Sequence, residues 1–327
     1  MKRQPLKSQP ARPFGITLLF AAIIGALAYL PASAAPPKAA LEAGYNTQTF
    51  ATRQFTSDNV DLSGSDRSGY QWYRMNFFKP RNELGLTRIE NGELITGGLG
   101  YDGAMTTVTK ISKWPYFAGV AFGGGAYFEA EISFDPERVN LREGVWPAWW
   151  SLTLESILEV PETFWRGQPP GYFNTIEVDF FEYDLQGSRL RTRNQYGAGI
   201  HHWYGTRGMC PKTPLCGHGS PYASGIQTGP SDIDWMKFHK FGALWIPATA
   251  DRPGSMTFFL DGKQSNQSIT WTMFKDEPPP PTSKTPWAFG PLDSLHLILV
   301  LSSGKSSPIR VRSVEVWQTD DSRNIRH

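Results

Sequence analysis

Cysteine is scarce in this chain of 327 residues, which contains only Cys210 and Cys216. Both lie in a loop rich in proline and glycine. In an exported protein the two would form a disulfide that closes a short loop. The alternative is a metal pair completed by the nearby His218, but two cysteines and one histidine lack the fourth ligand of a structural zinc site. We favour the disulfide and expect no metal there.

Long apolar runs and basic clusters are absent from most of the chain. After residue 30 no apolar stretch is long enough to cross a bilayer. Charged residues make up 19% of the chain, the formal net charge is +2, and no internal repeat is visible. Lysine and arginine form no patch of the kind that binds phosphate backbones, so the sequence argues against nucleic acid as a partner.

The N-terminus is the exception, because basic residues there precede an apolar run and a motif that fits a cleavage site. These features are Lys2, Arg3, Lys7 and Arg12, then Phe14 to Leu30, then Ala32-Ser33-Ala34. We therefore predict a signal peptide over residues 1–34 and a mature chain that is secreted or periplasmic and free of the membrane. Retention of the run as an uncleaved anchor is the alternative. Loss of the four basic residues lowers the formal net charge from +2 to −2.

Glycine, proline and aromatic residues are abundant. The chain contains 32 glycines and 26 prolines, and 13% of its residues are aromatic, a composition that favours many short strands and turns over long helices. The length suits one large domain or two medium ones. We expect a linker of small residues and prolines over residues 35–44 and a single domain over residues 45–320.

Six residues, Glu177 to Glu182, carry the clearest functional signal. Their valine and phenylalanines favour a strand, yet three of the six are acids, and a buried carboxylate is costly unless it is paired or hydrogen-bonded. In a regular strand Glu177 and Asp179 share one face, because side chains alternate with period two. One extra residue, a β-bulge at Phe180–Phe181, would return Glu182 to that face.

Three carboxyl groups on one face of a strand are suited to the hydrolysis of a glycosidic bond. Two of them about 5 Å apart can cleave a glycosidic bond with retention, one as nucleophile and the other as general acid and then base. A third carboxyl between them can hold the nucleophile and separate the two pKa values. The alternative is an edge strand whose acids are solvated.

The motif Glu-Val-Asp-Phe-Phe-Glu resembles the active-site signature of glycoside hydrolase family 16, in the bulged form (Glu-x-Asp-x-x-Glu) of its laminarinase, agarase and carrageenase branches. The resemblance implies that Glu177 is the nucleophile, Glu182 the general acid/base and Asp179 the residue that orients Glu177. It also implies an all-β fold, a concanavalin-like jelly-roll β-sandwich of two antiparallel sheets with a concave substrate cleft.

Two further segments resemble strands near the family's cleft. Residues 144–152 are similar to its Gly-x-Trp-Pro-Ala-x-Trp strand, so Trp146 and Trp150 are candidate platforms for sugar rings. Residues 198–205 are similar to a strand in which aromatics follow a histidine. The candidates for substrate binding there are His201, His202 and Trp203. All five could instead be core residues, and the sequence does not decide which histidine faces the cleft.

Other motifs follow in the family's order. Residues 123–134 resemble the strand before the active site, with Glu129 and Glu131 expected to face solvent. Residues 238–245 and 256–263 resemble two later strands, the second of which ends in an Asp-Gly hairpin turn. Arg312 stands where the family often has a calcium-ligating aspartate, so the match gives no support for a structural calcium.

Two stretches are harder to place. The aromatic-rich segment Tyr70–Phe78 could line a sugar cleft, but sandwich core is the favoured interpretation. The segment Thr153–Thr175 is longer than the family's equivalent, and we expect it to shape the cleft, since long loops beside active sites often do.

We therefore predict an exported, endo-acting hydrolase that cleaves a β-linked polysaccharide, with β-1,3-glucan favoured, by a retaining mechanism. It would act as a monomer and need no cofactor. A non-catalytic lectin-like module on the same fold and a transglycosylase with the same residues are the alternatives. The intact acid pair favours an enzyme over a lectin, because a binding module needs no protonated glutamate opposite an ionised one. Galactans and exopolysaccharides remain open as substrates.

Overall fold

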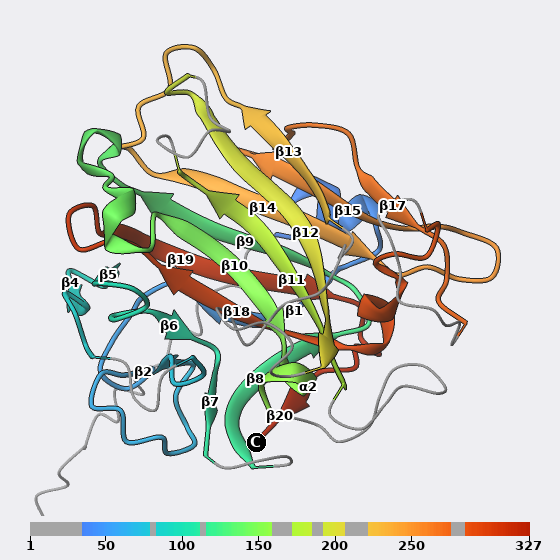
Figure 1. Ribbon diagram of the computed structural model, residues 1–327, viewed down its shortest axis with the longest axis horizontal. Coiled ribbons are helices and arrows are strands. Elements are labelled where there is room, and N and C mark those ends of the chain that lie inside the picture. Colours follow the sequence, from blue (N-terminus) through green and yellow to red (C-terminus); the bar gives the residue numbers. More distant parts are fainter. Residues whose placement is uncertain are drawn as a thin grey trace, which may run out of the picture. The chain divides into compact units, whose positions relative to one another are not determined.

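Two β-sheets packed face to face form the protein, whose computed structural model describes residues 35–78, 83–111, 116–158, 172–184, 192–206, 222–275 and 285–327. The described helical elements are all short. They are α1 (Lys38–Glu42), α2 (Leu154–Ile157) and the 3-10 turns η1 (Pro136–Arg138), η2 (Leu141–Glu143) and η3 (Gly290–Ser294). The all-β jelly roll predicted from the sequence is confirmed (Figure 1). Within the described ranges, no helix is long and apolar enough to span a membrane.

The outer sheet consists of nine described strands that pair in antiparallel fashion. In spatial order they are β16 (Lys263–Gln264), β15 (Gly254–Leu260), β14 (His239–Ile246), β9 (Ala126–Ser133), β19 (Ile309–Gln318), β5 (Glu93–Thr96) and β4 (Arg88–Glu90), with β1 (Thr47–Thr52) on β19 and β17 (Ile269–Trp271) on β15.

The inner sheet carries the acidic strand near its middle. In spatial order its main path is β13 (Tyr222–Thr228), β12 (Gln195–Thr206), β11 (Tyr172–Glu182), β10 (Ala148–Thr153), β18 (His296–Ser302), β6 (Met105–Thr106), β3 (Trp72–Arg74) and β2 (Val60–Asp61). The strand β8 (Phe117–Gly123) joins it through β18 and also pairs with β7 (Val108–Lys110) and β20 (Ile325–Arg326). The central strands β10, β11 and β12 are therefore flanked on both sides and cannot be an edge.

The hydrophobic core lies between the two sheets and uses one face of each strand. The ring of Phe128 in β9 stacks on Phe180 in β11 with centroids 5.2 Å apart, and Phe181 lies 4.1 Å from Phe241 in β14. Burial of such rings is the main favourable term in folding. Packing of these rings fixes which face of β11 points into the core. The acids lie on the opposite face, outside the core.

The predicted hairpin turn is confirmed at Asp261 and Gly262, where β15 turns back into β16. Both residues have positive φ, 50° and 74°. This left-handed backbone is the one that a two-residue Asp-Gly turn requires, because its twist matches that of the flanking strands.

Two parts of the outer sheet differ from expectation. The segment 35–44, predicted as a linker, contains α1, and Ala40 in that helix is fully buried among residues of the outer sheet. Glu129, expected in solvent, is only 8% exposed because Lys240 pairs with its carboxylate at 2.8 Å and Tyr127 donates a hydrogen bond to it. A carboxylate can be buried in this way when its partners are supplied by neighbouring strands.

Several sequence predictions fall on segments outside the described residues. They are the signal peptide over residues 1–34, the disulfide between Cys210 and Cys216, and most of the long loop after β10, from residue 159 to 171. These stay predictions.

Candidate active site

A β-bulge in β11 brings the three acids to one face of the inner sheet. Against β10, Phe181 pairs with Trp149 and Asp179 pairs with Trp150, so Phe180 has no counterpart. The same shift occurs against β12 between Asp179 and Glu182. Both phenylalanines consequently enter the core, and Glu182 returns to the face of Asp179. The predicted bulge is confirmed.

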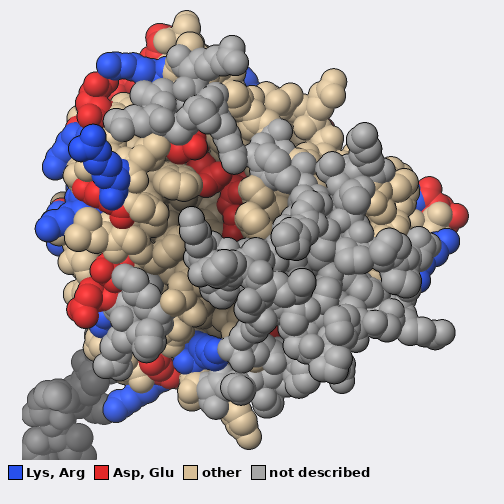
Figure 2. Space-filling model, viewed as in Figure 1, with Lys and Arg blue, Asp and Glu red and all other residues tan. Residues whose placement is uncertain are grey.

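The acids line a pocket on the inner sheet with a volume of about 230 Å³. Its walls combine three carboxyls, four aromatic rings and a hydroxyl. The lining residues are Tyr101, Gly144, Val145, Trp146, Ala148, Trp150, Glu177, Asp179, Glu182, Trp203 and Ser302. Figure 2 shows acidic surface inside a hollow on the face of the molecule that carries β10, β11 and β12. Aromatic walls around a few polar groups are typical of ligand sites.

Glu182 lies at the Trp146 end of the pocket. The indole Nε1 of Trp146 donates a hydrogen bond of 2.9 Å to its Oε1. The pKa of Glu182 is raised to about 8, mainly by burial and then by the charge of Asp179, while the hydrogen bond from Trp146 opposes both. Glu182 therefore holds a proton at neutral pH, as a general acid must.

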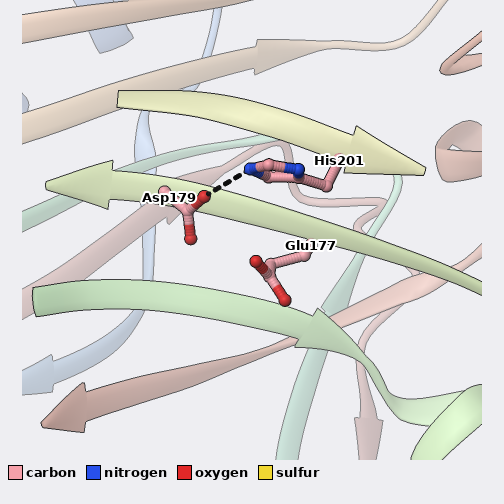
Figure 3. A group of neighbouring side chains, drawn as sticks. All are labelled: Glu177, Asp179 and His201. Atoms are coloured by element: carbon pink, nitrogen blue, oxygen red, sulfur yellow. Dashed lines mark ion pairs between the residues drawn. The ribbon is translucent and has the colours of Figure 1, made fainter. Parts of the chain in front are cut away.

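Glu177 lies at the other end, beside Asp179 and His201. The register sets Glu177 opposite His201 on β12, and His201 Nε2 lies 3.3 Å from Asp179 Oδ2. Figure 3 shows the carboxyl of Asp179 directed at the imidazole of His201, with Glu177 beside the pair. Burial raises the pKa of Glu177 well above its usual range, and the charge of Asp179 adds to this. His201 and the Trp203 indole lower that pKa, so these two neighbours favour the ionised form.

Trp203 forms a wall of the pocket next to Glu177. Its ring stacks on the ring of His201, with centroids 5.2 Å apart and planes 4° from parallel. The two residues lie on the same face of β12 because they are two positions apart. This stack fixes the imidazole beside the two acids and leaves the indole edge facing the pocket.

His202 does not line the pocket, contrary to its place among the candidate substrate-binding residues. Its side chain points into the opposite face of β12, is fully buried and donates from Nδ1 to the carbonyl oxygen of Ala288 at 2.8 Å. Burial lowers the pKa of His202 to about 4, so the ring is neutral. Strand alternation permits only one of two adjacent histidines to face the cleft, and that one is His201.

Trp150 and Tyr101 form the wall on the β18 side of the pocket. Trp150 is only 5% exposed and donates from Nε1 to Ser302 Oγ at 3.0 Å, so it is both core and wall. Phe78, 38% exposed, lies nearly parallel to Trp150 at 6.4 Å and close to Tyr101 at 5.1 Å. The segment Tyr70–Phe78, interpreted as core, is core at Trp72 and Tyr73 but ends beside the pocket.

Tyr101 and Ser302 are the lining residues that sequence reasoning missed. The pKa of Tyr101 is raised to about 12, mainly by burial and then by the charges of Glu177 and Asp179, which places the phenol near the acids. Tyr101 comes from the loop between β5 and β6, and Ser302 ends β18. No motif marks either residue, because only the packing of distant strands brings them to β11.

Three of these side chains could also bind a cation. Glu177, Asp179 and His201 each bring one potential ligand atom within 4.8 Å of the others. Carboxylate and imidazole are common ligands of divalent metals. The 3.3 Å contact between His201 Nε2 and Asp179 Oδ2, however, pairs the imidazole with a carboxylate without any metal. We therefore interpret the three side chains as parts of the acidic site and not as a metal site.

No protein-family model matches the chain. No curated protein matches it either. Solved structures do: endo-1,3-beta-glucanase from Streptomyces sioyaensis is 17% identical with a TM-score of 0.48, over 90% of this chain and 100% of that one. LamAcat from Zobellia galactanivorans is 14% identical with a TM-score of 0.41, over 84% and 99%. The exoplasmic/lumenal domain of VIP36, bound to Ca²⁺ and Man3GlcNAc, is 11% identical with a TM-score of 0.38, over 74% and 84%. At such identities and TM-scores the likeness carries no argument about this chain, and the chemistry of the site rests on its own geometry.

Proposed function

We propose that the protein is a glycoside hydrolase that cleaves a β-linked polysaccharide, with β-1,3-glucan favoured, and retains the configuration of the sugar. One observation carries the proposal: the bulge in β11 sets Glu177, Asp179 and Glu182 on one pocket face in unlike surroundings. Burial raises the pKa of both glutamates, and Glu182 keeps its proton at neutral pH. At Glu177 the imidazole of His201 and the indole of Trp203 oppose the rise and favour the ionised form. Unlike pKa environments for two neighbouring carboxyls are what acid and nucleophile require.

The proposed reaction has two steps. Glu182 gives its proton to the glycosidic oxygen as the bond between that oxygen and the anomeric carbon breaks, and the Glu177 carboxylate attacks the carbon from the opposite side. A glycosyl ester on Glu177 results. Glu182, now ionised, removes a proton from water, and the oxygen of that water displaces Glu177 from the anomeric carbon. Two inversions leave the β configuration intact.

The aromatic walls support a polysaccharide substrate. Trp146, Trp203 and Tyr101 surround the carboxyls, and rings of this kind stack against the C–H faces of sugars. We propose Trp146 and Trp203 as sugar contacts, with Trp150 behind them. A pocket of this composition recognises a pyranose by stacking and places its glycosidic oxygen beside Glu182.

The test is an assay of the purified protein on laminarin, mixed-linkage glucan, agarose, carrageenan and xyloglucan. We expect one of these to be cut internally, giving oligosaccharides whose first anomer seen by NMR is β, with activity unchanged by EDTA. An α anomer released first would contradict retention. Binding without any product would identify a lectin-like module, and new glycosidic bonds formed with excess acceptor sugar would identify a transglycosylase.

Export, monomeric state and the absence of a cofactor belong to the same proposal. Expression with the complete N-terminus should yield protein that begins at Ala35 and elutes as a monomer. N-terminal sequencing and size-exclusion chromatography with light scattering measure both. Protein that keeps residues 1–34 in the membrane fraction would instead support the uncleaved anchor.

A further inference from the structure

Trp203 presents a buried donor to the pocket. Its Nε1 is shielded from solvent, yet among the described residues it meets no acceptor in good hydrogen-bond geometry. Buried N–H groups are nearly always paired in folded proteins. An indole has one donor and no acceptor, so the partner that completes this site must be an acceptor oxygen.

Glu177 is the carboxyl that lies near this donor in the sheet, two residues beyond Thr175, which is directly opposite Trp203. Trp203 pairs with Thr175 and His201 pairs with Glu177, so Trp203 and Glu177 lie on the same face of adjacent strands, one register step apart. Both line the same pocket. The indole N–H already lowers the pKa of Glu177 from this position, which means that it acts on the ionised carboxylate.

His201 keeps the indole in this orientation. The two rings are nearly parallel, at 4°, and His201 is itself tied to Asp179 by the 3.3 Å contact between Nε2 and Oδ2. The stack keeps the plane of the indole parallel to that of the imidazole and so restrains the indole beside Glu177. A chain of contacts runs from Asp179 on β11 to His201 and then to Trp203 on β12.

We propose that Trp203 is a positioning residue whose indole N–H donates a hydrogen bond to the ionised carboxylate of Glu177, and that the His201 ring holds the indole for this bond. The inference rests on the proposed role of Glu177 as nucleophile. One carboxylate oxygen then takes the N–H while the other attacks the anomeric carbon. A charge-assisted bond of this kind stabilises the nucleophile and restrains its rotation.

The test replaces the donor but keeps an aromatic ring. Trp203→Phe removes the N–H next to Glu177, and Trp146→Phe, its matched control, removes the N–H that Glu182 accepts. Carboxyl titrations are followed by NMR in protein labelled with ¹³C-glutamate, and the two signals are assigned by their absence in Glu177→Gln and Glu182→Gln. Trp203→Phe should raise the apparent pKa of Glu177 by about one unit, and Trp146→Phe should raise that of Glu182 instead.

Kinetics separate this role from sugar binding. The acidic limb of kcat/KM reports the free enzyme, so Trp203→Phe should move that limb to higher pH by the same amount. An unchanged Glu177 titration, or a rise in KM with an unmoved acidic limb, would overturn the proposal in favour of a donor to sugar. The NMR titration needs no substrate, so a wild type that cuts no glycan refutes the proposed function without deciding this inference.

A second substitution covers the case in which Trp203→Phe does not fold. Benzothienylalanine in place of Trp203 keeps the shape of the indole and exchanges the N–H for sulfur. The stack on His201 is then preserved. The same upward shift of the Glu177 titration is expected, and its absence in a folded protein overturns the proposal.

Discussion

The two ends of β11 place the same residue type in different surroundings. At one end Glu182 accepts a bond from Trp146, and burial outweighs that bond, so the carboxyl keeps its proton up to a pH of about 8. At the other end Glu177 faces His201 and Trp203, which both oppose the effect of burial. Asp179 lies between the two and raises the pKa of both.

The difference shows how one strand can supply both an acid and a nucleophile. Residue type cannot assign the roles, because both residues are glutamates on the same face. The neighbouring strand contributes to the division, because β12 sets His201 directly opposite Glu177, where the imidazole is the third-largest influence on the pKa. At Glu182 the same imidazole is the smallest of the influences on the pKa, and the charge of Asp184 acts against it. Environments that push two carboxyls apart are the usual means of dividing acid and base roles.

Truncation of the two glutamates should impair the reaction in different ways. Glu177→Ala should abolish turnover on every substrate, because no ester can form. Glu182→Ala should lower activity on polysaccharide by about 10²- to 10⁴-fold but recover its first step on an aryl glycoside, whose leaving group needs no proton. Rates on both substrate types measure this.

Azide distinguishes the two variants by stereochemistry. With Glu182→Ala it should replace water and give a β product after two displacements, whereas with Glu177→Ala and an activated β substrate it should give an α product after one. NMR of the glycosyl azides reads the outcome. Reversed products would show that Glu182 is the nucleophile and Glu177 the general acid/base. Full activity in both variants would show that the catalytic residues do not lie on β11.

The second prediction concerns stability at the Glu182 end. The folded pKa of Glu182, about 8, lies above the ordinary glutamate value of 4.5, so the folded state binds more protons between these values. Stability therefore falls as pH rises through that window. Glu182→Gln removes the titration and keeps an acceptor for Trp146. It should stabilise the fold at pH 8 and above by up to about 4 kcal/mol.

Denaturant unfolding at a series of pH values measures this gain. The advantage of Glu182→Gln should shrink toward zero below pH 4.5, where the carboxyl is protonated in both states. A gain that is constant from pH 4 to 9 would mean that burial does not raise the pKa of Glu182. Active sites often hold such stability costs, because function requires the unfavourable group.

The sequence predicted the sandwich and the bulge because both follow from local chemistry. Two phenylalanines between acids demand a shift of register if rings and carboxyls are to reach opposite faces. It could not choose between His201 and His202, because the choice depends on which residue of β12 pairs with Glu177. The sequence could not predict that Tyr101 lines the pocket, for a related reason. Tyr101 is far from β11 in the chain and reaches the pocket only through the packing of β6 and β18.

The third prediction tests the aromatic wall at the Glu182 end. Trp146 is only partly buried and lines the pocket, so Trp146→Ala should weaken substrate binding by about 1–3 kcal/mol, by analogy with the stacking of bases on aromatics, and leave the fold intact. Calorimetric titration with an oligosaccharide, in the Glu177→Ala background, measures the loss. Loss of cooperative unfolding in Trp146→Ala would show that this ring is core.

Neutralisation of Asp179, which lies between the two glutamates, should produce a modest change at both. The charge of Asp179 raises the pKa of Glu177 and of Glu182, so Asp179→Asn should lower both. The acidic limb of kcat/KM requires ionised Glu177 and the basic limb requires protonated Glu182. Both limbs should therefore move to lower pH, each by about half a unit to one unit.

This joint shift to lower pH distinguishes Asp179→Asn from Trp203→Phe and Trp146→Phe. Each of these two variants should move one limb of the kcat/KM profile to higher pH. Turnover should also fall in Asp179→Asn, because the contact with His201 weakens and Glu177 loses part of its orientation. The β configuration of the product should persist, since Asp179 forms no bond to sugar. A pH–rate profile of the variant beside the wild type, with the anomer read by NMR, measures all three. Movement of the acidic limb alone would confine the action of Asp179 to Glu177 and leave Glu182 to be set by burial and Trp146.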